Sequence, residues 1–457
     1  MTKKLLLIAA VALATRATAG GLMTNTNYHV AFDRMMARGA STEIDAAYSN
    51  PAGLVWGYNG FQLSIDFQKP WQNRDIECNG VKYPGKASAP IVPALFASYK
   101  KDRLAVSSMI GIVGSGGYVK FNNGIPMFSV PVAATLAGNS ITQGYALDTK
   151  MEGKQYIYGG QVNVAYRLSD NFSASVGMRA NYYDGFTRGH LTAVAGNQLA
   201  GMLQQIGMLP TGKADLVNMQ LDCNQTGWGF APIVGFNTHI GPLTVAARYE
   251  FRTKLKTKND TKQLIIGSMG QDVDIKAMAE KIGTQQTVAA LSQTTLSAMA
   301  PKIGEYLPDE ETRYDMPALL SLAVGYEFTD KLRVTAEYHF FDDKNAKMSG
   351  DRQKELKSGT NEYLIGAEYD INDRFTVSLG GQRTDYGLSD GYQTDTSFAC
   401  DSYSIGLGGA WNVTDKIRLN AGYFCTIYSD YTKTAAYGQE TFSRTNNVVG
   451  VGVDFKF

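Results

Sequence analysis

The chain has 457 residues, and its 43 Lys+Arg against 42 Asp+Glu give a net charge of +1 at pH 7. This balance argues against a nucleic-acid-binding protein, which usually carries a basic excess. The 48 glycines and 26 tyrosines, with few helix-favouring stretches, favour an all-β protein with many turns and an aromatic surface.

The first residues, MTKKLLLIAAVALATRATAG, have the three parts of a secretory signal peptide. Two lysines precede the apolar run Leu5–Ala14, and Ala17-Thr18-Ala19 is a small-x-small cleavage site. We expect residues 1–19 to be removed on export. The apolar run is too short to span a bilayer as a helix, and no later stretch has about 18 consecutive apolar residues. If the exported chain enters a membrane, it must therefore do so as a β-barrel.

Residues 20–59 do not show strand alternation. A short helix is predicted within residues 28–38, and Asn50-Pro51 predicts a turn before a second short helical segment. A segment of this size has no core of its own and must pack against the rest of the chain.

A repeated phrase marks four β-hairpins further along the chain. Each copy has an aromatic residue, a tight polar turn around Asp, and then alternating apolar and polar residues, which is the period of a strand with one apolar face. The four copies read YRLSDNFSASV, YEFTDKLRVTAEY, YDINDRFTVSL and WNVTDKIRLNA. Two weaker turns, at residues 100–103 and 240–243, predict two more hairpins.

Six hairpins with one strand before and one after them make about fourteen strands, most long enough to cross a bilayer at a tilt. The predicted strands are 60–69, 91–99, 104–114, 155–168, 172–185, 228–239, 244–256, 318–328, 332–342, 361–371, 375–386, 401–413, 417–429 and 444–457. The opposite connections are long: 70–90, 115–154, 186–227, 257–317, 343–360, 387–400 and 430–443. Tight turns at one end, long loops at the other and a terminal Phe457 on an alternating strand are typical of an outer-membrane barrel. A soluble β-sandwich rarely keeps such asymmetry.

Two stretches resemble the FadL-type outer-membrane transporters of long-chain fatty acids and other hydrophobic compounds. They are RGASTEIDAAYSNPAGL (Arg38–Leu54) and GWGFAPIVGFNTHIGPLTVAARYEF (Gly227–Phe251). The resemblance implies an all-β, fourteen-stranded antiparallel transmembrane barrel over residues 60–457, with residues 20–59 as a small helical hatch in its lumen. It also implies a location in the bacterial outer membrane, contact with its lipid, and passive uptake of hydrophobic molecules.

The resemblance assigns hatch gating to Asn50, Pro51 and Ala52. It also implies a kinked third strand that opens the barrel wall. Glycine inside a strand often marks a bulge or kink, and the predicted third strand runs into four glycines. They are Gly111, Gly114, Gly116 and Gly117. A strand that simply ends in a glycine-rich loop remains an equal alternative.

Apolar residues at helical spacing occur in the two longest loops. They predict helices that need a partner. The helices either pack only on each other or also form a groove that captures hydrophobic molecules. Methionine suits such a groove because its flexible side chain adapts to ligands of different shapes. The predicted groove residues are Leu199, Met202, Leu203, Ile206, Leu291, Leu296 and Met299.

Catalytic motifs are missing from the sequence. There is no His-Glu-x-x-His, no Gly-x-Ser-x-Gly and no phosphate-loop ending, so we expect no enzyme, cofactor, metal or nucleotide-driven step. Glu337 and His339 share the lumen face of one strand and are expected to be polar wall. A disulfide bond between Cys78 and Cys223 is possible. The predicted function is passive uptake of hydrophobic molecules, above all long-chain fatty acids, by a monomer. The expected route runs through a groove of the extracellular loops, a lumen gated by the hatch and a lateral opening in the wall. The alternative is a structural, adhesive or porin-like barrel without hydrophobic transport.

Overall fold

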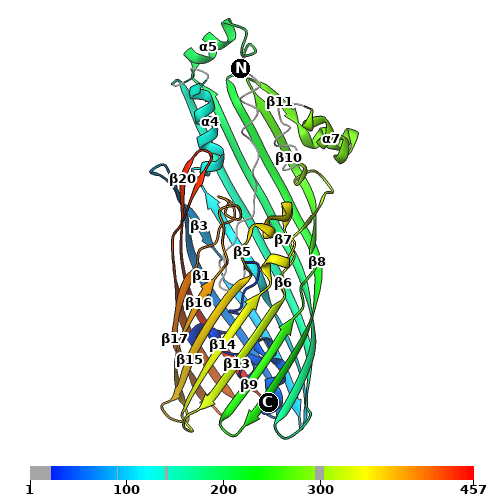
Figure 1. The fold of residues 1–457 in the computed structure, drawn as a ribbon, viewed down its shortest axis with the longest axis vertical. Coiled ribbons are helices and arrows are strands. Elements are labelled where there is room, and N and C mark those ends of the chain that lie inside the picture. Colours follow the sequence, from blue (N-terminus) through cyan, green and yellow to red (C-terminus); the bar gives the residue numbers. More distant parts are fainter. Residues whose placement is uncertain (1–21, 90, 139–140, 142, 294–302) are drawn as a thin grey trace.

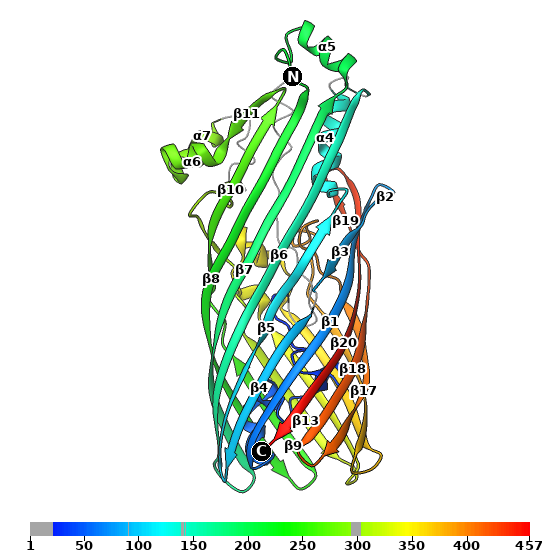
Figure 2. The same cartoon turned by 180° about the vertical axis from the view of Figure 1, so that it is seen from behind.

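The computed structural model describes residues 22–89, 91–138, 141, 143–293 and 303–457, so the predicted signal peptide lies outside the described residues. Fourteen strands of the described chain form a closed antiparallel barrel (Figures 1 and 2). They are β1 (Gly60–Cys78), β4 (Val92–Lys101), β5 (Leu104–Phe121), β6 (Tyr145–Arg167), β7 (Phe172–Ala195), β8 (Asp215–Ile240), β9 (Leu243–Glu250), β13 (Leu319–Glu327), β14 (Leu332–Phe341), β15 (Thr360–Asp370), β16 (Phe375–Asp385), β17 (Ser402–Thr414), β18 (Ile417–Tyr428) and β20 (Gly438–Lys456). The predicted fold and strand number are confirmed.

The first and last strands close the barrel. β1 pairs with β20 from Gln62↔Lys456 to Cys78↔Glu440, and on its other side with β4. Along the strands, buried polar side chains face the lumen and alternate with exposed apolar ones such as Val162, Val176 and Leu379. A continuous belt of exposed apolar side chains is unstable in water and is the lipid-facing surface of a membrane barrel.

Aromatic side chains mark the end of the barrel that carries the tight turns. Tyr166, Tyr326, Tyr369 and Trp411 are all exposed beside these turns. Rings in such a row favour the interface between lipid and water. The hairpin turns therefore lie at one membrane surface, as the repeated phrase predicts.

Three neighbouring strands extend far beyond the barrel at the opposite end (Figure 1). β6, β7 and β8 continue as long hairpins, and β10 (Lys256–Ser268) pairs with the upper part of β8. The prediction that 115–154 and 186–227 are loops throughout is wrong. Outward side chains there become charged, as in the Lys154–Asp184 pair, because this region lies above the lipid. The expected apolar alternation stops while the strands continue.

The smaller elements lie at the same end of the molecule. They are β2 (Val81–Tyr83), β3 (Gly85–Ser88), α4 (Pro126–Gly138), α5 (Asn197–Gln205), β11 (Gln271–Asp274), α6 (Ile275–Ile282), α7 (Thr284–Ser292), β12 (Glu311–Arg313), η3 (Asp343–Asn345), η4 (Ser349–Glu355) and β19 (Tyr431–Ala435). Among the described residues, no helix has both the length and the hydrophobicity to cross a bilayer.

The segment before the first strand lies inside the barrel (Figure 1). We call residues 22–59 the hatch. It contains α2 (Val30–Arg34), α3 (Ala46–Ser49) and η2 (Pro51–Trp56). The helix predicted within 28–38 is present but short, because His29 caps its start and Met35 is already extended at φ −153°. Nearly every residue up to Gly39 is buried, so the lumen wall provides the core that the hatch itself lacks.

Candidate functional site

The first helix of the hatch is fixed to the two strands that close the barrel. His29 Nδ1 accepts a hydrogen bond from the Ala31 backbone N–H at 3.0 Å, and Asp66 Oδ1 accepts one from Val30 at 2.9 Å. His29 Nε2 lies 3.5 Å from both Asp66 Oδ2 and Asp454 Oδ1. Burial lowers the pKa of His29, and the two carboxylates raise it by more. Because Nδ1 accepts from Ala31, the ring proton lies on Nε2, which faces both carboxylates and joins the helix to β1 and β20.

Two buried arginines of the hatch form ion pairs with one wall carboxylate. Arg34 contacts Glu368 of β15 directly, and Arg38 Nη1 lies 3.1 Å from Glu368 Oε2. Arg38 also binds Asp45 at 2.7 Å and Glu43 at 2.8 Å within the hatch. All but Glu43 are almost fully buried, so removing one partner would leave an uncompensated buried charge at a cost of about 3–5 kcal/mol.

Two wall arginines extend this network. Arg333 of β14 binds Glu368 at 3.1 Å, and Arg418 of β18 contacts Glu43. The network therefore joins the hatch to β14, β15 and β18. We call Arg34, Arg38, Glu43, Asp45, Arg333, Glu368 and Arg418 the hatch latch.

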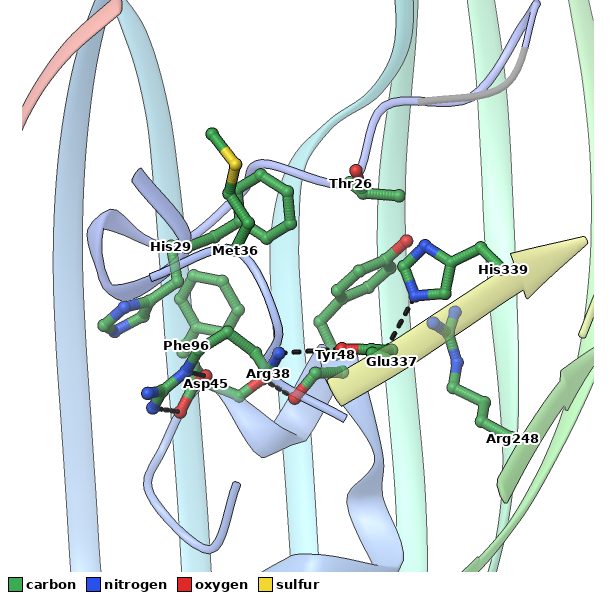
Figure 3. A pocket seen from close by; sticks show the side chains of 12 residues that line it. Thr26, His29, Met36, Arg38, Asp45, Tyr48, Phe96, Arg248, Glu337 and His339 are labelled. Carbon is green, nitrogen blue, oxygen red and sulfur yellow. Dashed lines mark hydrogen bonds and ion pairs between the residues drawn. The ribbon is translucent and has the colours of Figure 1, made fainter. Parts of the chain in front are cut away.

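The hatch backbone at Arg38 and Gly39 also binds a carboxylate of the wall (Figure 3). Glu337 Oε2 accepts hydrogen bonds from the backbone N–H groups of Arg38 and Gly39, both at 2.8 Å. A Cβ at Gly39 would lie 2.6 Å from Glu337 Oε1, so only glycine allows this approach. His339 Nε2 lies 2.7 Å from Glu337 Oε1 and its Nδ1 lies 3.0 Å from Glu362. The pair is polar lumen wall, as predicted.

Asn50, Pro51 and Ala52 hold the other end of the hatch against β7 and β8. The Asn50 side chain donates to the Phe236 carbonyl at 2.8 Å and accepts from the Ala52 N–H at 3.3 Å, while Pro51 starts η2. Ser173 Oγ donates to the Ala52 carbonyl at 2.8 Å. The three predicted residues form one rigid, buried turn near the hairpin end of the barrel.

The wall is irregular where the four glycines were predicted to bend it. β5 pairs with β4 as far as Ile110↔Leu95 and pairs again, with β3, from Tyr118↔Ser88. Within the described part of the chain, no strand pairs with β5 on that side between these points, over a stretch that contains Gly111, Gly114, Gly116 and Gly117. On the other side, β5 has two register shifts, at Ile112/Gly114 and Ser115/Gly117.

The N-terminal part of the hatch lies against this irregular stretch. Asn25 N–H and Tyr28 Oη donate to the Val113 carbonyl at 3.1 Å and 2.9 Å. A Cβ at Gly114 would collide with the Met23 carbonyl. The hatch thus supplies hydrogen bonds that a neighbouring strand would otherwise make.

A cavity of about 20 Å³ remains between hatch and wall, lined by Phe32, Met36, Tyr48, Phe96 and the Glu337–His339 pair among others (Figure 3). One water needs about 10–15 Å³ on this scale, so the cavity accepts roughly one water molecule. This cavity is too small for a hydrophobic ligand while the hatch is seated.

The predicted groove residues are distributed over two separate places. Leu203 is buried in a core cluster with Val132 and Leu136 of α4, whereas Leu291 belongs to another cluster with Ile275 of α6. Leu199 is partly buried beside the first cluster, while Met202 of α5 and Ile206, directly after α5, are exposed. Leu296 and Met299 lie outside the described residues. The structure does not bring Leu203 and Leu291 together.

All four cysteines are free thiols. Cys78, Cys223 and Cys400 are buried in one core cluster, so the Cys78–Cys223 disulfide is not formed. Cys425 faces Ile405 across the β17–β18 pair.

The hatch latch itself was not found from the sequence. Its hatch members and its wall members are far apart in the chain, and Arg34 and Glu368 are separated by 334 positions. The one available signal was that all five charged residues of the hatch lie between Asp33 and Asp45, in a segment that has to pack inside the barrel.

Comparisons with known proteins agree with this architecture. Residues 281–457 match the family model described as "Outer membrane protein beta-barrel domain". No curated protein matches the sequence. A crystal structure of a Pseudomonas aeruginosa FadL homologue is 15% identical with a TM-score of 0.64, covering 96% of this chain and 100% of that one.

Two toluene transporters have a similar fold. The Pseudomonas putida protein TodX is 14% identical with a TM-score of 0.58, covering 91% of this chain and 95% of its own. The Ralstonia pickettii protein TbuX is 14% identical with a TM-score of 0.50, covering 95% and 97%. At these identities the likeness establishes a shared fold.

Proposed function

We propose that this chain is a channel of the bacterial outer membrane that takes up hydrophobic molecules passively, with long-chain fatty acids as the substrate class. The observation that carries the proposal is a closed barrel whose lumen contains a hatch held to the wall by buried ion pairs. An open porin needs a wet lumen, and a structural barrel needs no seated hatch. The similar structures of a FadL homologue and two toluene transporters support uptake of hydrophobic molecules.

The proposed path has three steps. A ligand lands on the apolar helices outside the membrane, passes into the lumen above the hatch, and leaves sideways through the wall near Gly111–Gly117. The interrupted pairing between β5 and its neighbours supports the last step, because few hydrogen bonds have to break there. The hatch residues bound to Val113 would have to move first. We expect one chain to suffice, with no energy source beyond the ligand gradient.

We expect the Asn50→Ala/Pro51→Ala variant to lose uptake of labelled hexadecanoate. The change removes a buried amide that bonds both hatch and wall, and such bonds are worth about 1–3 kcal/mol when their partner is left buried. Uptake would be measured in cells lacking the protein and complemented with wild type or variant, with surface amounts matched. A surfaced variant with wild-type uptake would remove the gating role of this turn.

A charge on the exposed face of α5 is expected to lower ligand capture. Met202 is 54% exposed, so Met202→Asp should leave the fold intact while making the landing surface hydrophilic. Gln205→Asp on the same helix adds the same charge at an exposed polar position and is the matched control. We expect a several-fold lower initial rate for Met202→Asp at low ligand concentration, and an unchanged rate for the control. Equal rates for both variants would remove α5 from the path.

A further inference from the structure

Aromatic side chains mark the upper edge of the lipid-facing surface where the long strands leave the barrel. Tyr158 of β6 is exposed eight residues beyond Tyr166, with the exposed Val162 between them. Eight residues span about 26 Å of strand, close to the height of roughly 25 Å of the apolar band in such barrels. Trp228 of β8 is exposed in the same cross-strand row, where the Tyr182 ring packs on it at 4.7 Å. Side chains beyond this row therefore lie at the level of the lipid head groups.

Five cations stand on the outer face of neighbouring strands beyond these rings. They belong to β3, β5, β6 and β7, which adjoin on the side seen in Figure 2. Lys120 of β5 lies directly opposite Lys86 of β3 on one side and opposite Glu152 of β6 on the other. The five, which we call the basic face, are Lys86, Lys120, Lys150, Lys154 and Arg188.

Three carboxylates neutralise only part of the basic face. Within the described chain, no carboxylate forms an ion pair with Lys86 or Lys120. Like charges directly opposite each other on paired strands are destabilising, so these two lysines favour an anion between them. The three ion pairs that do form are Lys150–Glu152 at 3.1 Å, Lys154–Asp184 at 2.7 Å and Arg188–Asp222 at 2.9 Å.

A polar hollow of about 390 Å³ continues from the basic face along the outer surface of β6, β7 and β8. Lys150 and Arg188 line it together with His190, Gln220 and Gln263. Amide groups donate and accept hydrogen bonds, as the hydroxyl groups of a sugar do. A hollow of this volume lies within the range of small-molecule sites, about 300–1,000 Å³.

Arg188 stands where the basic face and the hollow meet. The centre of the Phe186 ring lies 4.1 Å from its central carbon, and Asp222 binds its Nε. The guanidinium is therefore held in one orientation, and its planar fork matches the oxygens of a phosphate. One ligand with phosphate and sugar groups could contact both areas at once.

We propose that the basic face and the hollow bind the phosphorylated sugar head group of a glycolipid in the outer leaflet of the membrane. Phosphate lies on Lys86 and Lys120, the sugar fills the hollow, and the acyl chains lie against the apolar wall below Tyr158. The inference rests on the membrane location in the proposed function and does not depend on which molecule the channel transports. The site lies on the outside of the wall, so its occupant is a lipid neighbour of the protein and not its cargo.

The test measures lipid binding by the purified, detergent-solubilised protein with native mass spectrometry. The probes are diphosphorylated lipid A, the same lipid with both phosphates removed, and phosphatidylglycerol. The proteins are wild type, Lys86→Gln/Lys120→Gln and the control Lys256→Gln/Lys258→Gln, which loses the same charge on β10. Both control lysines are already paired with carboxylates at 2.8 Å.

We expect Lys86→Gln/Lys120→Gln to bind diphosphorylated lipid A roughly ten-fold more weakly than wild type, because charge-assisted hydrogen bonds to phosphate are lost. The control should stay within about two-fold of wild type, since its lysines are engaged by carboxylates. Wild type should bind the dephosphorylated lipid and phosphatidylglycerol more weakly than lipid A. Gln220→Trp, which fills the hollow, should weaken the binding of lipid A both with and without its phosphates.

Equal affinity of wild type and Lys86→Gln/Lys120→Gln for lipid A would overturn the site, and so would an equal loss in the control. Phosphatidylglycerol bound as tightly as lipid A by wild type would overturn the glycolipid assignment. The measurement contains no transport step. A failure of hexadecanoate uptake would therefore overturn the proposed substrate and leave this site standing.

Discussion

Oxidation of a cysteine pair placed at Ala40 and Gly325 is expected to stop hydrophobic uptake, and reduction is expected to restore it. Ala40 belongs to the hatch and Gly325 to β13, and a Cβ built at Gly325 lies 3.0 Å from the Ala40 Cβ. Disulfides need about 3.5–4.5 Å between these atoms, so a shift of about half an ångström is enough. The proposed path requires the hatch residues bound to the wall to move, so a hatch locked to the wall should block uptake.

The control for this experiment uses the single variants Ala40→Cys and Gly325→Cys under the same oxidant. These single variants show whether oxidation of the four native thiols, which are free in this structure, changes uptake by itself. Mass spectrometry would confirm the bond in the double variant. Undiminished uptake by the fully oxidised pair would show that ligands pass without movement of this part of the hatch.

The second large effect is expected at the hatch latch. Glu368→Ala removes the carboxylate shared by Arg34, Arg38 and Arg333, leaving buried guanidinium groups without it. Breaking such a buried pair costs about 3–5 kcal/mol, enough to shift the hatch away from its seated position. We expect an ion leak, measured as conductance across a planar bilayer, where wild type is nearly silent.

Glu311→Ala is the matched control for the latch. Glu311 also pairs with a cation, Lys256 at 2.8 Å, but its side chain is 58% exposed. An exposed pair contributes at most about 1 kcal/mol, so this variant should remain as silent as wild type. If Glu368→Ala were equally silent, the buried ion pairs would not be what holds the hatch.

The barrel could be predicted because its pattern is local. The polar turn after Tyr326 and the alternation from Leu332 to Tyr338 identify one hairpin without reference to any other segment. The same reasoning stopped too early at residues 115–154, because it depended on apolar outward faces. Above the lipid, pairs such as Arg188 with Asp222 replace those faces, and the strands continue.

The interior of the barrel could not be predicted in this way. A strand pattern tells which side chains face the lumen, but not which of them meet a hatch residue hundreds of positions away. Asn50 was found through a motif, and the structure shows what its side chain bonds. Glu368 carries no motif, and only the folded barrel brings it to Arg34 and Arg38 of the hatch.

A barrel that takes up hydrophobic molecules should exclude hydrophilic ones. The initial uptake of labelled hexadecanoate and of a labelled disaccharide can be compared in the same cells, with and without the protein at the surface. We expect the protein to raise the rate for hexadecanoate and to leave the rate for the disaccharide unchanged. A higher rate for the disaccharide would indicate an open porin, and no change for either would contradict hydrophobic uptake.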